Sequence, residues 1–151
     1  MEKFKNIDEI LDFAMQSEQE AVDFYKGLAQ HAKTKDMEEI FEKFAQEEVS
    51  HKARLNEIKE KGSYEIPDEK VADLQIADYT TKVQPKPDMD YQDALVVAMQ
   101  KEKAAFRLYS NLAQRAPNEE MKQLFEALAM EESKHKLRFE LEYDEHILRE
   151  N

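Results

Sequence analysis

Residues 40–55 read IFEKFAQEEVSHKARL and residues 124–139 read LFEALAMEESKHKLRF, so one pattern occurs twice, offset by 84 positions. In both stretches apolar residues recur at intervals of three and four, the spacing of one face of an α-helix. The middle of each apolar face carries a glutamate and, three residues later, a histidine: Glu48 with His51, and Glu132 with His135. The repeat predicts two equivalent helices, each burying a carboxylate and an imidazole.

The same offset extends upstream without a gap. Glu18 aligns with Glu102, and Tyr25, seven residues after Glu18, aligns with Tyr109. Each half therefore reads as an antiparallel pair of helices, with the glutamate and the tyrosine on one face of the first helix. The sequence predicts one domain over residues 1–151, made of a hairpin repeat at 6–61 and 90–149 and a crossover at 62–89.

Composition supports an all-α fold. The chain has two glycines and four prolines, whereas a fold of many short strands needs frequent turn residues. One hairpin cannot bury its apolar face alone, so we expect a four-helix bundle with a long crossover between the second and third helices. A linker between separate hairpins is the alternative. Asn6, with Glu9 as a capping-box partner, is expected to begin the first helix, and Gly62 to follow the second.

All four predicted helices direct one glutamate inward, and two of them add a histidine. Four buried carboxylates repel one another and lose their hydration, so they need compensating charge. Two divalent cations would balance them, and oxygen and nitrogen donors suit iron or manganese, with zinc also acceptable. The alternative is an ionic network with nearby basic residues, which fall toward the edge of the apolar stripe. The predicted metal ligands are Glu18, Glu48, His51, Glu102, Glu132 and His135.

The sequence also suggests positions for several residues outside the predicted ligand set. Glu47 and Glu131 lie about 100° from the ligand direction on a helical wheel and are expected to surround the site rather than to ligate. Tyr25 and Tyr109 are expected to bond ligand carboxylates, with a redox role as the alternative. His31 and His146 have no histidine counterpart in the repeat and are expected to be ordinary solvated or capping residues.

Charge and cysteine content exclude several classes of function. A net charge of −12 argues against nucleic acid and anionic membranes as partners, since both need a basic face. The absence of cysteine excludes disulfides, thiolate nucleophiles and iron–sulfur clusters. The charged N-terminus lacks the apolar core of a signal peptide, so we expect a cytoplasmic protein.

The two Glu-x-x-His motifs, each preceded by Glu-x-x-Ala-x-x-x-Tyr, resemble the rubrerythrin branch of the ferritin-like di-iron carboxylate superfamily. The resemblance covers all four helices and implies two iron ions at the six ligand positions. It also implies a homodimer. Rubrerythrins carry in addition a cysteine-bound rubredoxin domain, which this chain lacks, so turnover would need an external electron donor. They also place a further glutamate where this chain has Ala105.

The leading functional hypothesis is a non-haem oxidoreductase that reduces hydrogen peroxide or dioxygen in oxidative-stress defence. Glu48 and Glu132 would bridge the two metals, and the other four ligands would be terminal. An Fe(II)-oxidising protein for iron binding or storage is one alternative. A bundle that uses its metals only for stability is another.

Overall fold

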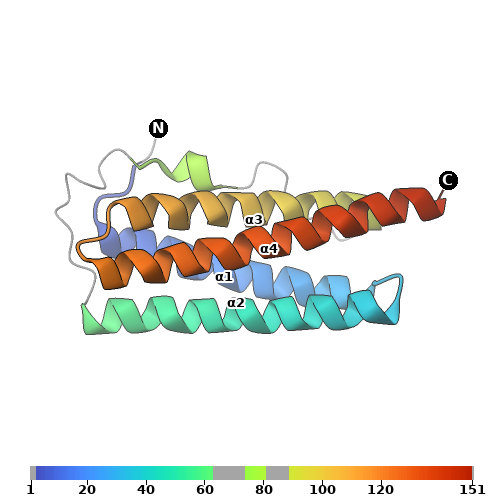
Figure 1. The fold of residues 1–151 in the computed structure, drawn as a ribbon, viewed down its shortest axis with the longest axis horizontal. Coiled ribbons are helices and arrows are strands. Elements are labelled where there is room, and N and C mark those ends of the chain that lie inside the picture. Colours follow the sequence, from blue (N-terminus) through green and yellow to red (C-terminus); the bar gives the residue numbers. More distant parts are fainter. Residues whose placement is uncertain (1–2, 63–73, 81–88, 151) are drawn as a thin grey trace.

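The computed structural model describes residues 3–62, 74–80 and 89–150, and four long helices dominate them (Figure 1). In chain order the elements are α1 (Ile7–Gln30), α2 (Lys35–Lys61), the short 3₁₀ helix η2 (Ile76–Tyr79), α3 (Tyr91–Gln114) and α4 (Glu119–Glu150). The fold is an all-α, ferritin-like four-helix bundle, as predicted. Among the described helices, none is long and apolar enough to cross a bilayer.

Side-chain caps set where the helices begin. Asn6 accepts a hydrogen bond from the backbone N–H of Glu9 at 2.9 Å, and Asp90 accepts one from Asp93 at 2.8 Å. Asn118 caps α4 in the same way, because its side-chain oxygen accepts a hydrogen bond from the N–H of Met121. One detail of the capping-box prediction was wrong. The Glu9 carboxylate accepts a 2.9 Å hydrogen bond from the backbone N–H of Lys5 instead of from that of Asn6.

Gly62 ends α2 as predicted. Its φ of 61° lies in the left-handed region, where a residue without Cβ meets no steric penalty. Its N–H bonds back to the carbonyl groups of Ile58 and Lys59, which satisfies the end of the helix.

The predicted crossover lies in part outside the described residues, at 63–73 and 81–88. Residues 74–80 lie beside α3 (Figure 1), where Asn111 donates a 2.6 Å hydrogen bond to the hydroxyl of Tyr79. Phe4 adds an aromatic contact to Tyr79 and a backbone hydrogen bond to Leu74. The single-domain boundary stays a prediction.

The two hairpins pack into one bundle, so the alternative of separate hairpins is wrong. The helices of each hairpin contact each other along their length, whereas α1 and α3 touch less extensively. Apolar side chains form two clusters, one toward each end of the bundle. Leu11, Leu55 and Phe125 belong to one cluster, and Phe41 and Phe139 to the other. Buried polar residues fill the space between them.

Candidate metal centre

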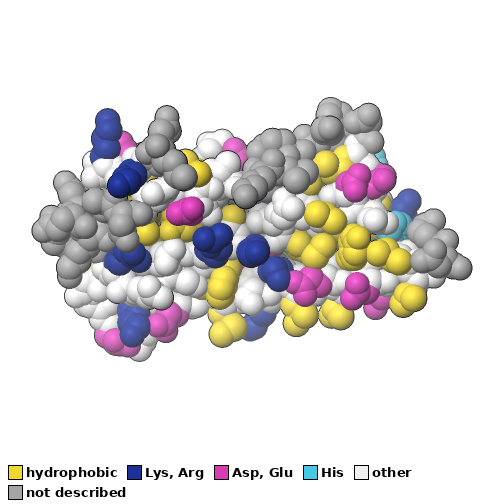
Figure 2. All heavy atoms as spheres, turned by 90° about the horizontal axis from the view of Figure 1, so that it is seen from above, with side chains coloured by type: hydrophobic (Ala, Val, Ile, Leu, Met, Phe, Trp, Pro, Cys, Tyr) yellow, Lys and Arg dark blue, Asp and Glu magenta, His cyan; other side chains and the backbone are white. Residues whose placement is uncertain are grey.

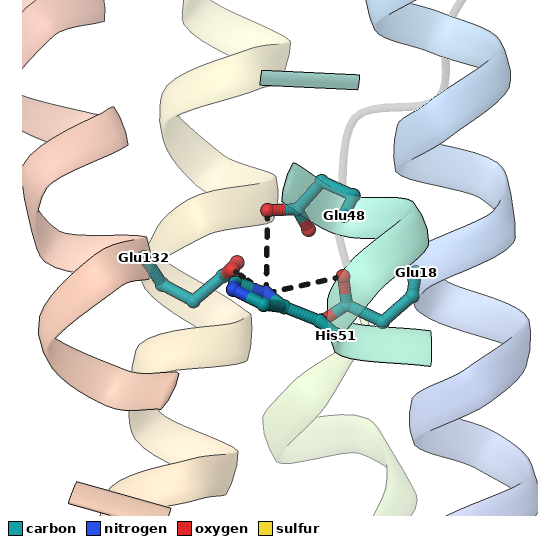
Figure 3. A group of neighbouring side chains, drawn as sticks. All are labelled: Glu18, Glu48, His51 and Glu132. Atoms are coloured by element: carbon teal, nitrogen blue, oxygen red, sulfur yellow. Dashed lines mark ion pairs between the residues drawn. The ribbon is translucent and has the colours of Figure 1, made fainter. Parts of the chain in front are cut away.

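Each of the four helices contributes one glutamate to the middle of the bundle. Glu18 comes from α1, Glu48 from α2, Glu102 from α3 and Glu132 from α4, and every one of them is at most 2% exposed. In Figure 3, Glu18, Glu48 and Glu132 point toward His51 from three different helices. The structure therefore brings together the residues that the repeat predicted.

The six predicted ligands form two overlapping groups. One comprises Glu18, Glu48, His51 and Glu132, and within it one ligand atom from each residue lies within 4.8 Å of the others. The second group obeys the same limit and consists of Glu48, Glu102, Glu132 and His135. Glu48 and Glu132 belong to both, as expected of carboxylates that bridge two metals.

The two histidines face the cluster through Nδ1. In His51 this atom lies 2.8 Å from Glu132, 3.5 Å from Glu48 and 3.7 Å from Glu18. In His135 it lies 3.2 Å from Glu48 and 3.4 Å from Glu102. The two environments follow the repeat, since each imidazole faces the shared carboxylates and the glutamate that precedes it in its own hairpin.

One donor atom of each predicted ligand is buried without a hydrogen-bond partner. Such atoms are rare in folded proteins because each one loses its hydration without compensation. Two metal ions, one for each group, would satisfy all six atoms, so the donor set fits a pair of divalent cations. The six atoms are Glu18 Oε2, Glu48 Oε1, His51 Nδ1, Glu102 Oε2, Glu132 Oε1 and His135 Nδ1.

The electrostatics of the cluster show the same need for positive charge. Burial and the neighbouring carboxylates raise the pKa of Glu48 and of Glu132 well above the ordinary value. Burial lowers the pKa of His135, but the facing carboxylates of Glu102 and Glu48 outweigh it and raise that pKa to about 10. Protons therefore occupy the cluster at neutral pH unless cations replace them.

Outer carboxylates hold the far side of each imidazole. His51 Nε2 lies 2.5 Å from Glu131 Oε2, and His135 Nε2 bonds to Glu47. A proton on Nε2 that is donated to a carboxylate leaves the lone pair of Nδ1 directed at the cluster, the arrangement typical of metal-binding histidines. Glu47 and Glu131 thus surround the site as expected. Their pairing with the opposite hairpin was not foreseen.

The tyrosines also bond across the two halves. Tyr25 donates its hydroxyl hydrogen bond to Glu102, and Tyr109 donates to Glu18. Both hydroxyls are buried beside carboxylates, which raises the pKa of each tyrosine well above its ordinary value. The expectation that they bond ligand carboxylates is confirmed, and neutral hydroxyls are the form that can donate.

A cavity of about 190 Å³ reaches the cluster between α1 and α3. Carboxylates of all four predicted glutamate ligands line its inner end, together with Tyr25 and Tyr109. Its outer part is lined by Ser17, Glu20, Lys101 and Thr80, among others. Sequence periodicity could not reveal this opening, because it depends on how far apart α1 and α3 lie.

One minor expectation was wrong. His146 is buried, with its ring 5.1 Å from that of Tyr91, whereas the sequence suggested a solvated or capping residue. It follows the buried Glu142 by one turn of α4, on the face that continues the ligand stripe. That spacing is the signal that could have placed it inside. His31 is exposed, as expected.

The rubrerythrin family model matches residues 9–143, which include all six predicted ligands. The chain belongs to the rubrerythrin family. Searches of curated proteins and of solved structures gave no significant match. Family membership and the buried cluster together indicate a metal site in this rubrerythrin-family bundle.

Proposed function

We propose that this rubrerythrin-family chain is a non-haem di-iron oxidoreductase that reduces hydrogen peroxide or dioxygen. The observation that carries the proposal is the pair of overlapping donor groups that share Glu48 and Glu132. Shared carboxylates favour two metals close together, and such pairs suit two-electron chemistry on a small oxidant. Manganese fits the same oxygen and nitrogen donors.

The chain's own residues would prepare the site for that chemistry. Tyr25 and Tyr109 fix the orientation of Glu102 and Glu18 by hydrogen bonds, which limits how these terminal carboxylates swing. The outer carboxylates keep the Nε2 proton of each histidine in place, so that Nδ1 stays available. The bound irons would supply the electrons.

The cavity favours a small reactant. A volume of about 190 Å³ is below the roughly 300–1,000 Å³ of drug-sized ligand sites, which favours a small reactant. Reduction of one hydrogen peroxide to two water molecules consumes two electrons and two protons. The protein would receive the electrons from an external donor, and we propose that it works in the cytoplasm in defence against oxidative stress.

The test begins with protein purified without added metal. Metal analysis should find about two iron or manganese ions per chain, and the visible spectrum of the reduced, iron-loaded protein should change rapidly on addition of peroxide or dioxygen. Glu48→Ala should remove both the metal and the response. Glu42→Ala, on the exposed face of the same helix, is the matched control and should retain both. Equal rates for native protein and Glu48→Ala would refute the proposal.

Oxidation of Fe(II) as a substrate is the second candidate function. The carboxylate of Glu20 lines the cavity together with Glu18, and acidic side chains along an entry path attract metal cations. With an excess of reductant, an oxidoreductase consumes peroxide for many cycles, whereas an iron-storing protein accumulates ferric iron. If neither occurs, and chelation only lowers the melting temperature, the metals serve stability alone.

A further inference from the structure

The cavity between α1 and α3 is bordered by a segment that belongs to neither half of the repeat. Tyr79 and Thr80 line it from η2 and from the residue that ends η2, whereas the other described lining residues lie on the four long helices. Figure 1 shows η2 lying along the bundle beside α3. Thr80 is exposed and Tyr79 is only 5% exposed, so the segment reaches from the surface into the wall of the cavity.

The ring of Tyr79 is held by several contacts. Asn111 of α3 donates a 2.6 Å hydrogen bond to its hydroxyl, and the centroid of the Phe4 ring lies 6.4 Å from that of the Tyr79 ring. The ring also belongs to the apolar cluster that contains Ala14 and Leu108, and both of these residues line the cavity. A buried ring whose hydroxyl is hydrogen-bonded is a fixed part of the wall.

Three tyrosines line the cavity, and only Tyr79 is separate from the ligand set. Tyr25 and Tyr109 bond to Glu102 and Glu18 at the inner end. Tyr79 bonds to Asn111 instead, so its ring narrows the cavity without orienting a predicted ligand. The width of the cavity can therefore be changed at Tyr79 while the cluster stays intact.

The outer part of the cavity suits a small, polar, uncharged reactant. Ser17 and Thr80 offer hydroxyl groups there, and Lys101 offsets the charge of Glu20. Figure 2 views the molecule from the side on which η2 lies in Figure 1, and there too Lys and Arg side chains lie among Asp and Glu side chains. Size, more than charge, is thus the property by which this opening can distinguish reactants.

We propose that the ring of Tyr79 sets the size limit of the cavity, so that hydrogen peroxide and dioxygen reach the cluster and alkyl hydroperoxides do not. The choice of reactants rests on the proposed function, whereas the size limit is a property of the cavity alone. tert-Butyl hydroperoxide would need the same two electrons and two protons, and would yield tert-butanol and water. In a closely fitting pocket even one additional methylene changes specificity by about 10–200-fold.

Removal of the ring tests the limit in the reduced, iron-loaded protein. Tyr79→Ala should raise the ratio of kcat/KM for tert-butyl hydroperoxide to kcat/KM for hydrogen peroxide by about tenfold or more. The ratio is used because it cancels differences in iron content and in the intrinsic reactivity of the two peroxides. Tyr79→Phe keeps the ring and should keep the native ratio. Asp78→Ala is the matched control, because Asp78 is an exposed residue of η2 that does not line the cavity.

Circular dichroism would verify that each of these variants is folded. An unchanged ratio in Tyr79→Ala would overturn the proposal. So would an equal rise in Asp78→Ala, because the effect would then come from disturbance of η2 and not from loss of the ring.

The metal-free protein tests the size limit without any turnover, because a paramagnetic solute broadens the NMR signals of the groups it reaches. The methyl groups of Ala14 and Ala21 are buried and line the cavity. Dissolved dioxygen should broaden both signals in native protein and in Tyr79→Ala. The bulky nitroxide 4-hydroxy-TEMPO should broaden them in Tyr79→Ala alone. Ala45, buried away from the cavity, is the reference that the nitroxide should not reach in either protein.

The two readouts separate failure of the size limit from failure of the proposed function. Equal effects of the nitroxide on native protein and on Tyr79→Ala would show that the ring is not the limit, and the proposal would be wrong. If no variant reduces either peroxide, the proposed function fails, and the nitroxide experiment still decides whether Tyr79 limits entry.

Discussion

Glu48→Gln should have opposite effects on stability with and without metal. The substitution keeps the size of a side chain that is 1% exposed and removes its charge from both donor groups. In the metal-free protein the ligand atoms of each group lie within 4.8 Å of one another. Two carboxylate charges at that separation repel by about 3 kcal/mol at an effective dielectric constant of about 20. The raised pKa of Glu48 relieves part of this repulsion by protonation.

The metal-free Glu48→Gln variant should therefore be more stable than the native protein by about 1–3 kcal/mol at pH 8, less than one full pair repulsion. With Fe(II) at about 100 times its dissociation constant, each native site gains about 2.7 kcal/mol, or about 5 kcal/mol for both. For a chain of this length that corresponds to a rise in melting temperature of roughly 10–20 °C. The variant should lose most of this rise, because both sites lack their shared ligand.

Thermal unfolding is followed by circular dichroism with and without anaerobic Fe(II). It gives the stability difference between the two metal-free proteins and the rise in melting temperature that metal causes in each. Glu42→Gln makes the same chemical change on the exposed face of α2 and should alter neither melting temperature by more than about 2 °C, the usual limit for surface substitutions. If Glu48→Gln destabilises the metal-free protein as much as the metal-loaded one, Glu48 serves as a structural acceptor, and the reasoning about the cluster is wrong.

Three further predictions follow from the surroundings of the ligands. Tyr109→Phe should cost about 1.5–3 kcal/mol in urea unfolding, because Glu18 loses a buried hydrogen bond, and an unchanged midpoint would mean that this bond is not made. Glu131→Gln should weaken metal binding by about 10–100-fold in a chelator competition, because His51 loses the carboxylate that orients it; unchanged affinity would contradict this role. The melting temperature of the metal-free protein should fall progressively from pH 5 to pH 10. Folding raises the pKa of both shared glutamates and of both histidines. Protonation of these four groups therefore stabilises the folded state at low pH, and this stabilisation is lost as the pH rises through their folded pKa values. With Fe(II) the gain from metal should instead grow as pH rises, because the ligands bind in their deprotonated forms, and parallel pH profiles with and without metal would rule this out.

The burial and clustering of the six predicted ligands could be foreseen from the sequence, because periodicity and an ungapped repeat both depend on local spacing. Glu48 and Glu132 each occupy the centre of an apolar stripe, and a buried stripe has to carry its polar residues inward. That reasoning places side chains on a face of one helix. It does not reveal which helix lies opposite.

The relations across helices were therefore missed. The bond of Glu131 to His51, rather than to any residue of its own hairpin, depends on how α4 crosses α2. The cavity depends on the separation of α1 and α3, and the burial of His146 on how far α4 extends along α3. Each is a consequence of packing geometry, which a one-dimensional pattern does not contain.

The exchange of hydrogen bonds between the halves has a consequence for how this sequence can change. Tyr25 serves a ligand in the second hairpin and Tyr109 serves one in the first, and the outer glutamates are exchanged in the same way. A substitution in one hairpin therefore alters the hydrogen bonds made to predicted ligands of the other hairpin. The two halves have to stay compatible with each other, which fits a repeat that aligns without a gap.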